Sequence, residues 1–232
     1  MLVKYWMKRD VVTVDADSSM NKAVSIMKTD RPILLPVLKK GKLVGVLTDG
    51  DVKKASASEA TSLEIHELAY LLSRIKVSDI MSSTVITVPP DFTVEEAAAQ
   101  LLLNDISGMP VVDDRGKIVG IISQREIFLA LITLSGFGKR GLQLALEVED
   151  RPGSIKEVTD IIRSYGGRLV SILTSYEKAA PGHRRLYVRA WAVEREKLPQ
   201  MEADLRSKAS LLYVVDHKDG TRREFVHSDQ AA

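Results

Sequence analysis

The sequence contains no cysteine among its 232 residues. It therefore has no disulfide framework, no thiolate nucleophile and no thiolate metal site. It also lacks an uninterrupted apolar run near the ~20 residues that a membrane-spanning helix needs, because the run over residues 128–134 is far too short. From this, and because the start MLVKYWMKRD has no apolar h-region and no small-residue cleavage site, we expect no membrane segment, no signal peptide and a cytoplasmic location.

Several kinds of functional residue are also scarce. The net charge is only +2 and aromatic residues make up 5% of the chain, so the basic strand around His183 to Arg189 lacks the stacking platform of a nucleic-acid-binding protein. The 4 histidines show no metal-ligand spacing. Phosphate-binding glycine loops and nucleophile–base motifs are missing. We expect no nucleic-acid partner, no metal, no required cofactor and no catalytic residues.

The remaining composition is that of a globular protein. Hydrophobic residues make up 45% and charged residues 28% of a chain of 232 residues, which is enough for two domains of ordinary size with cores of their own.

An internal repeat organises the first half of the chain. Sliding the sequence by 74 positions aligns Met7 with Met81 and brings several dipeptides into register. A unit of roughly 50 residues therefore occurs twice. The aligned Thr-Val, Pro-Val and Val-Gly pairs begin at Thr13 and Thr87, at Pro36 and Pro110, and, after a slip of one residue, at Val44 and Val119.

Each copy predicts a βαββα unit. In the first, a β-branched strand over 11–14 precedes a polar cap and an amphipathic helix over 20–28. A strand ending in Pro-Val, a glycine turn and a strand over 43–48 then lead into a second helix near Asp51. The second copy repeats this order, with strands expected over 85–88 and 118–123, a helix over 94–103 and a second helix near Glu126.

Two such units can bury sheet faces that neither could bury alone. We predict one domain over residues 1–135, with repeats at about 1–55 and 77–135 and a helical insert at 56–76. The first residues of the insert, 56–62, are small and polar and favour a loop.

The pattern changes after the glycine-rich and basic residues 135–141, which indicate a domain boundary and hinge. Residues 141–216 predict strand, helix, strand, strand, helix and strand, the ferredoxin-like order with helices on one face of an antiparallel sheet. The fold class is therefore α+β. The polar tail, 217–232, is expected to be loosely held.

The strand ends of the two repeats hold the best candidate for a site. In Thr48-Asp49-Gly50-Asp51 a strand meets a helix start, where free backbone N–H groups favour anions. Thr48 could contact a phosphate, and the acceptor-only Asp51 suits a ribose diol. The same spacing also fits a helix capping box, and spacing alone favours that simpler interpretation.

The repeat resembles a tandem pair of CBS domains, which bind adenosyl ligands such as AMP, ATP or S-adenosylmethionine. The resemblance rests on the Thr-Val openings, the Pro-Val strands and Gly-x-x-Thr/Ser-x-x-Asp. It implies that the Thr or Ser contacts phosphate, the Asp contacts ribose and the strand before Pro-Val flanks adenine. The implied nucleotide-binding residues are Thr13, Ile33, Leu35, Pro36, Thr48, Asp51, Thr87, Ser107, Met109, Pro110, Ser123, Arg125 and Glu126.

The second copy departs from this pattern because Glu126 stands where the ribose aspartate is expected. Its extra methylene would spoil a bidentate grip on a diol, and Arg125 would favour phosphate. We therefore expect two unequal sites, with the Asp51 site the better one.

The C-terminal part resembles an ACT domain, a small ligand-sensing module. The turn at Asp150, Arg151, Pro152, Gly153, Ser154 and Ile155 carries the resemblance, which implies backbone N–H groups offered to an amino acid. Gly153 would allow a carboxylate to approach the backbone. Dimerisation without a ligand is the other role that the resemblance leaves open.

A CBS pair followed by an ACT domain is similar to the AcuB-like proteins of acetoin utilisation. These resemblances imply a non-catalytic regulator that senses an adenosyl ligand, forms a homodimer and acts on a metabolic protein partner. Two alternatives stay open: a structural dimeric adaptor that binds no nucleotide, and an enzyme with an unrecognised site.

Overall fold

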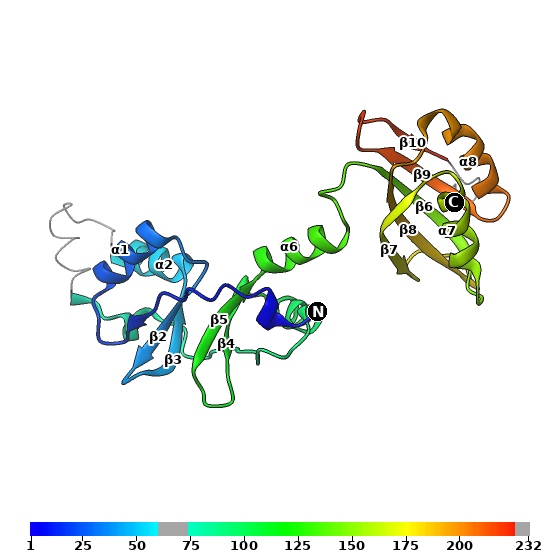
Figure 1. Cartoon of the computed structure of the whole chain (residues 1–232). Helices are drawn as coiled ribbons and strands as arrows, with labels where there is room; N and C mark the ends of the chain where they lie inside the picture. The colour runs from blue at the N-terminus through cyan, green and yellow to red at the C-terminus, as the bar shows by residue number, and fades with distance from the viewer. Residues whose placement is uncertain (60–73, 226–232) are drawn as a thin grey trace. The chain divides into compact units, whose positions relative to one another are not determined.

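The computed structural model describes residues 1–59 and 74–225 and divides the chain into two compact units, Met1–Ala130 and Leu131–Ala232 (Figure 1). The first unit holds both repeats and the second holds the ferredoxin-like order of elements. Most of the predicted insert at 56–76 lies outside the described residues.

The first repeat is a three-stranded sheet with two helices. Strand β1 (Val14–Asp15) pairs in parallel with β2 (Leu35–Lys39), which pairs antiparallel with β3 (Lys42–Leu47). Helix α1 (Met20–Asp30) begins at Ser19, whose side chain accepts a hydrogen bond from the Lys22 backbone N–H. Helix α2 (Asp49–Glu59) follows β3. The βαββα order is confirmed for this repeat, but the strand predicted over 11–14 is observed only at Val14–Asp15.

The second repeat has the same elements with a weaker first strand. Helix α5 (Val94–Leu103) begins at Thr93, and β4 (Gly108–Val112) pairs antiparallel with β5 (Ile118–Ser123) before α6 (Gln124–Leu134). The strand predicted over 85–88 is reduced to one parallel bridge from Val88 to Val111. Pro89 and Pro90 follow Val88 and lack N–H donors, so the pairing cannot extend in that direction.

The loop predicted at 56–62 is wrong over residues 56–59, because α2 continues to Glu59. Alanine and serine are small, but unlike proline they have a backbone N–H, and unlike glycine they have no extra backbone conformational freedom. A run of them therefore does not end a helix.

The segment that leads into each repeat packs on the other repeat. Val3, Met7 and Trp6 join the core of the second repeat, whereas Val77, in the short helix α4 (Val77–Ile80), joins the core of the first. A 3-10 helix, η1 (Val3–Tyr5), begins the N-terminal segment, drawn in dark blue in Figure 1. This exchange makes the two repeats one unit.

The repeated Val-Gly pair has its explanation in this exchange. A Cβ atom on Gly45 would lie 2.4 Å from Sδ of Met81, and one on Gly120 would lie 2.5 Å from Sδ of Met7. Only glycine leaves room for the methionine that crosses from the other repeat.

The second unit is a five-stranded antiparallel sheet in the order β10-β9-β6-β8-β7, with two helices packed on one face (Figure 1). Alternate residues of β6, Leu142, Leu144 and Leu146, form the core with residues of both helices. The elements are β6 (Leu142–Glu149), α7 (Ser154–Ser164), β7 (Arg168–Ser175), β8 (His183–Trp191), η2 (Arg195–Lys197), α8 (Leu198–Arg206), β9 (Ser210–Asp216) and β10 (Arg222–Glu224).

The predicted βαββαβ order is confirmed, and β10 is an addition to it. The expectation of a loosely held tail is wrong for residues 217–225. Arg223 of β10 donates hydrogen bonds to the buried carboxylate of Glu202, and Phe225 packs against the core beneath Arg206.

The predicted hinge, residues 135–141, packs on the sheet of the second unit. The second unit therefore begins before the hinge. The Ser135 carbonyl accepts hydrogen bonds from Arg189 Nε and Ser171 Oγ, each at 2.8 Å. Phe137 makes an edge-to-face contact with His217. Among the described residues, no helix is long and apolar enough to cross a membrane.

Candidate functional site

A cleft of about 510 Å³ lies within the first unit, at the end of β3. Both repeats contribute to its walls, as the resemblance implies for an adenosyl site. The first repeat supplies Ile33, Leu34, Val46 and residues 48–51, and the second supplies Ser82, Thr84, Ile86, residues 105–108 and Pro110.

Thr48 and Asp51 are paired at one wall of this cleft, where β3 ends and α2 begins. The backbone N–H of Thr48 donates to Oδ2 of Asp51 at 2.8 Å, and the Thr48 hydroxyl donates to the same oxygen at 2.6 Å. The Asp51 N–H donates back to Oγ1 of Thr48 at 3.3 Å. The capping box is therefore formed, and the same two polar side chains line the cleft.

Apolar side chains line the opposite parts of the cleft. Ile33 comes from the segment before β2 and is 51% exposed. Ile86 and Ile106 come from the second repeat. Three branched side chains in one cleft with the Thr48 hydroxyl and the Asp51 carboxylate suit a flat heterocycle joined to a diol-bearing sugar.

Some of the residues predicted near adenine, in and before the Pro-Val pairs, line the cleft. Ile33, Ser107 and Pro110 line the cleft. Leu35 and Met109 are fully buried and belong to the cores of the first and second repeat. Pro36 is also buried, within β2. Leu35, Pro36 and Met109 lie outside the lining of the cleft, and contacts of this backbone with adenine stay a prediction.

The two Thr-Val threonines lie elsewhere. Thr13 lines a separate cleft of about 340 Å³ beside Gly41, Lys42 and Arg115. Thr87 is exposed and lies outside the residues that line the Asp51 cleft. Ligand contacts from Thr13 and Thr87 stay a prediction, and from the segment before the second repeat Thr84 and Ile86 line the Asp51 cleft.

The second motif reproduces the pairing of the first. The backbone N–H of Ser123 donates to Oε2 of Glu126 at 3.1 Å, and the Ser123 hydroxyl donates to the same oxygen. Ser123, Arg125 and Glu126 lie outside the lining of the Asp51 cleft. The longer side chain of Glu126 still folds back onto its own helix start, so the inequality of the two sites stays a prediction.

Sequence reasoning missed Ser82, Thr84 and Asp105, which line the Asp51 cleft. Ser82 reaches it because its backbone pairs with Val46 of the first repeat. A contact between segments so far apart leaves no periodic signal. Asp105 adopts a positive φ of 50°, and the aligned Arg31 has a φ of 46°, so a matched left-handed position was the only available hint.

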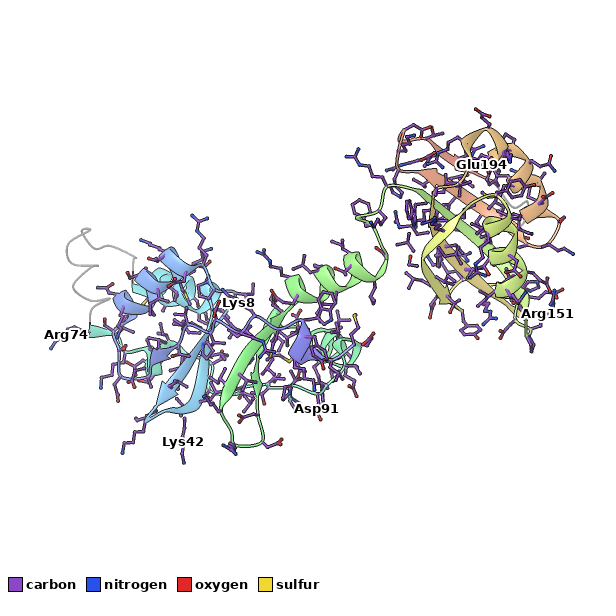
Figure 2. All side chains as sticks on the ribbon, in the orientation of Figure 1. Lys8, Lys42, Arg74, Asp91, Arg151 and Glu194 are labelled. Carbon is purple, nitrogen blue, oxygen red and sulfur yellow. The ribbon has the colours of Figure 1, made fainter. Side chains whose placement is uncertain are left out.

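The turn at 150–155 uses most of its polar groups internally. Arg151, labelled in Figure 2, donates two hydrogen bonds to Glu157 and one to Glu149. These bonds hold the pKa of the Glu157 carboxyl below its usual value. The Asp150 carboxylate lies 3.5 Å from Arg184 Nε, and Pro152 precedes Gly153, which has a φ of 91°.

The start of α7 is engaged in the same way. The Ser154 N–H donates to the Arg151 carbonyl at 3.3 Å, and its hydroxyl donates to the same carbonyl at 3.0 Å. Ile155 packs against the core. An amino-acid ligand at this turn stays a prediction. Among the described residues, no group of His, Asp or Glu side chains could hold a metal ion.

Known proteins match the first unit. Residues 3–58 and 77–133 match the family model of the CBS domain. The chain is 30% identical over 155 residues to protein MJ1426 of Methanocaldococcus jannaschii, an uncharacterised protein, covering 57% of this chain and 92% of that one.

Two solved structures are similar over the same region. The CBS pair of MJ0100, solved with 5′-methylthioadenosine and S-adenosyl-L-methionine, is 30% identical with a TM-score of 0.49, over 56% of this chain and 99% of that one. An AcuB-type acetoin utilization protein of Vibrio cholerae is 22% identical with a TM-score of 0.50, over 60% of this chain and 95% of that one, and supports the fold alone.

Several other relatives are enzymes of which the chain spans only 21% to 24% of the length. The repeat, the exchanged segments and the family match agree over residues 3–133. These residues form a tandem pair of CBS domains, and the chain belongs to the CBS-domain family.

Proposed function

We propose that this protein is a non-catalytic cytoplasmic regulator that binds an adenosyl ligand in the Asp51 cleft. The observation that carries the proposal is the Thr48–Asp51 pair in a cleft walled by both CBS repeats. Membership of a family that binds such ligands supports the same conclusion.

The binding geometry follows from the groups in the cleft. The Asp51 carboxylate accepts hydrogen bonds from the two ribose hydroxyls, and the adenine ring lies against Ile33 and Ile106. The Thr48 hydroxyl already donates to Asp51, so this pair is oriented before a ligand arrives. Ligand binding then adds hydrogen bonds without ordering new backbone.

Both repeats contact the ligand, so binding stabilises one arrangement of the first unit over others. We propose that residues 135–141 pass this change to the second unit, which dimerises as an ACT-like domain and binds a metabolic protein partner. An amino acid bound at the turn 150–155 would be a second input.

Exposed apolar side chains support the proposed homodimer. Phe128 and Leu131 of α6 are 59% and 57% exposed, and Ile172 and Leu173 lie on the edge strand β7. A second copy that covers such residues removes their apolar surface from water.

Isothermal titration calorimetry of the full chain with AMP, ATP and S-adenosylmethionine tests the proposal. A ligand should bind the wild type, and Asp51→Ala should weaken it about tenfold or more, because a hydrogen bond to a charged group contributes about 1.5–3 kcal/mol. Glu126→Ala, at the aligned position, serves as the matched control and should leave the binding that depends on Asp51 unchanged.

The alternatives give different results in the same experiment. A structural adaptor shows no heat of binding with any of the three ligands. An enzyme shows turnover of ATP that Asp51→Ala abolishes. Binding by Asp51→Ala equal to that of the wild type contradicts the assigned site.

A further inference from the structure

The charged side chains that line the Asp51 cleft are all acidic. They are Asp49, Asp51 and Asp105, and the described lining residues include no lysine, arginine or histidine. A site for a 5′-phosphorylated nucleotide usually supplies cationic or free N–H donors to the phosphate.

The three carboxylates differ in how far their charge is compensated. Asp49 forms an ion pair with Lys53, one turn along α2. Asp51 accepts only neutral hydrogen bonds from Thr48. Asp105 is exposed, with no ion pair among the described residues. At least two negative charges therefore face the cleft without a cationic partner.

The start of α2 offsets this charge only in part, because the Thr48 and Asp51 N–H groups are already bonded. A helix N-terminus attracts anions because its first N–H groups lack partners. Here Asp49 and Asp51 already occupy the first turn of α2, and the Thr48 N–H is bonded to Asp51. A phosphate at this position would have to displace a carboxylate or lie beside it.

Three aligned positions of the other repeat carry cations. Lys8, labelled in Figure 2, pairs with Ile121 as Ser82 pairs with Val46. Arg31 has the same left-handed conformation as Asp105. Arg125 aligns with Gly50 of the first motif. Lysine and arginine therefore stand at three positions where the Asp51 cleft has neutral or acidic residues, whereas Asp10 aligns with Thr84.

We infer that the Asp51 cleft selects adenosine ligands whose 5′ group is uncharged or a sulfonium cation, and discriminates against 5′-phosphates. This inference rests on the proposed function, because it assumes that adenosine binds there. The ribose diol still meets Asp51, whereas the 5′ substituent meets the field of the acidic side chains. The negative field attracts the positive charge of a sulfonium and repels the negative charge of a phosphate, whereas an uncharged thioether is neither attracted nor repelled.

Three probes that differ in the charge of the 5′ group test the inference: S-adenosylmethionine, 5′-methylthioadenosine and AMP. Titration of the full chain should show the first two binding more tightly than AMP in the phase that Asp51→Ala removes. The ratio of the S-adenosylmethionine affinity to the AMP affinity should decrease as the salt concentration rises from ~0.01 M to ~1 M, since salt screens exposed charges.

Asp105→Asn isolates the charge. Asparagine also tolerates a left-handed backbone, so the fold is retained, which an unchanged thermal unfolding midpoint would verify. The variant should bind AMP about two- to fivefold more tightly and S-adenosylmethionine more weakly by a similar factor, the scale of an exposed charge pair. Binding of 5′-methylthioadenosine should stay unchanged. Asp91→Asn removes an exposed acid outside the cleft and should alter none of the three affinities.

The possible failures are distinct. If none of the probes binds, the proposed function itself is wrong. If AMP binds more tightly than S-adenosylmethionine in the Asp51-dependent phase, or if Asp105→Asn leaves the affinities of both unchanged, the charge selection is wrong while the adenosyl site stands.

Discussion

At the scale of single residues, the repeated Thr-Val pairs and the repeated Val-Gly pairs have different structural roles. The Thr-Val pairs aligned well, yet Thr13 and Thr87 lie outside the Asp51 cleft. The Val-Gly and methionine positions aligned equally well, and they prove to be contacts between repeats: Gly45 with Met81 and Gly120 with Met7. Alignment of a repeat identifies positions under the same constraint, but only coordinates distinguish packing from ligand contact.

Gly45→Ala should destabilise the first unit by about 1–3 kcal/mol, because the added Cβ overlaps the Met81 side chain and also lies 3.0 Å from the Ser82 carbonyl oxygen. Denaturant unfolding measures the change. Gly138→Ala is the control, since a Cβ there meets nothing within 4 Å. Equal stability of the two variants would refute the packing role of Gly45.

His217 should make the second unit sensitive to mild acid. Burial, with the nearby charge of Arg189, lowers its pKa below the ordinary 6.5 in the folded state. The unfolded chain therefore binds this proton at higher pH, and the stabilisation, present above about pH 6.5, is lost as pH falls through the folded pKa.

The comparison is wild type against His217→Gln by thermal unfolding between pH 8 and pH 5. The wild type should lose more stability over this range than the variant does. A difference between the two proteins that stays constant with pH would contradict the role of His217.

At the scale of elements, most of the fold followed from local patterns. Alternating apolar residues predicted β6 and β8, and helical spacing with a polar cap predicted α1 and α5, because these signals lie within one segment. The strand β10 was missed because Arg222–Glu224 is polar and pairs only at the edge of β9. The lining residues Ser82 and Thr84 were missed because the segment before the second repeat reaches the Asp51 cleft by pairing with Val46 of the first repeat.

Arg223→Ala should detach β10 and cost about 2 kcal/mol, because it leaves the buried Glu202 carboxylate without its main partner. This value is below the range for fully buried pairs, since the Arg223 side chain is 39% exposed. Hydrogen exchange at residues 222–224 and the free energy of unfolding measure it. Arg222→Ala, the exposed neighbour, should change both less, and equal effects would argue against the ion pair.

At the scale of the whole molecule, the chain combines a CBS pair with a second unit that has a core of its own. An adenosyl ligand should stabilise the first unit directly, by about 2.7 kcal/mol at a concentration 100-fold above its dissociation constant. Hydrogen exchange should show added protection in β2, β3 and β4. Protection confined to residues 142–216 would place the ligand in the second unit instead.

The most direct test of the adenosyl site is a crystal structure of the chain grown with S-adenosylmethionine. We predict density for the ribose with its two hydroxyls within hydrogen-bond distance of the Asp51 carboxylate and the adenine against Ile33 and Ile106. An empty Asp51 cleft in a crystal that holds the ligand elsewhere on the chain would contradict the account.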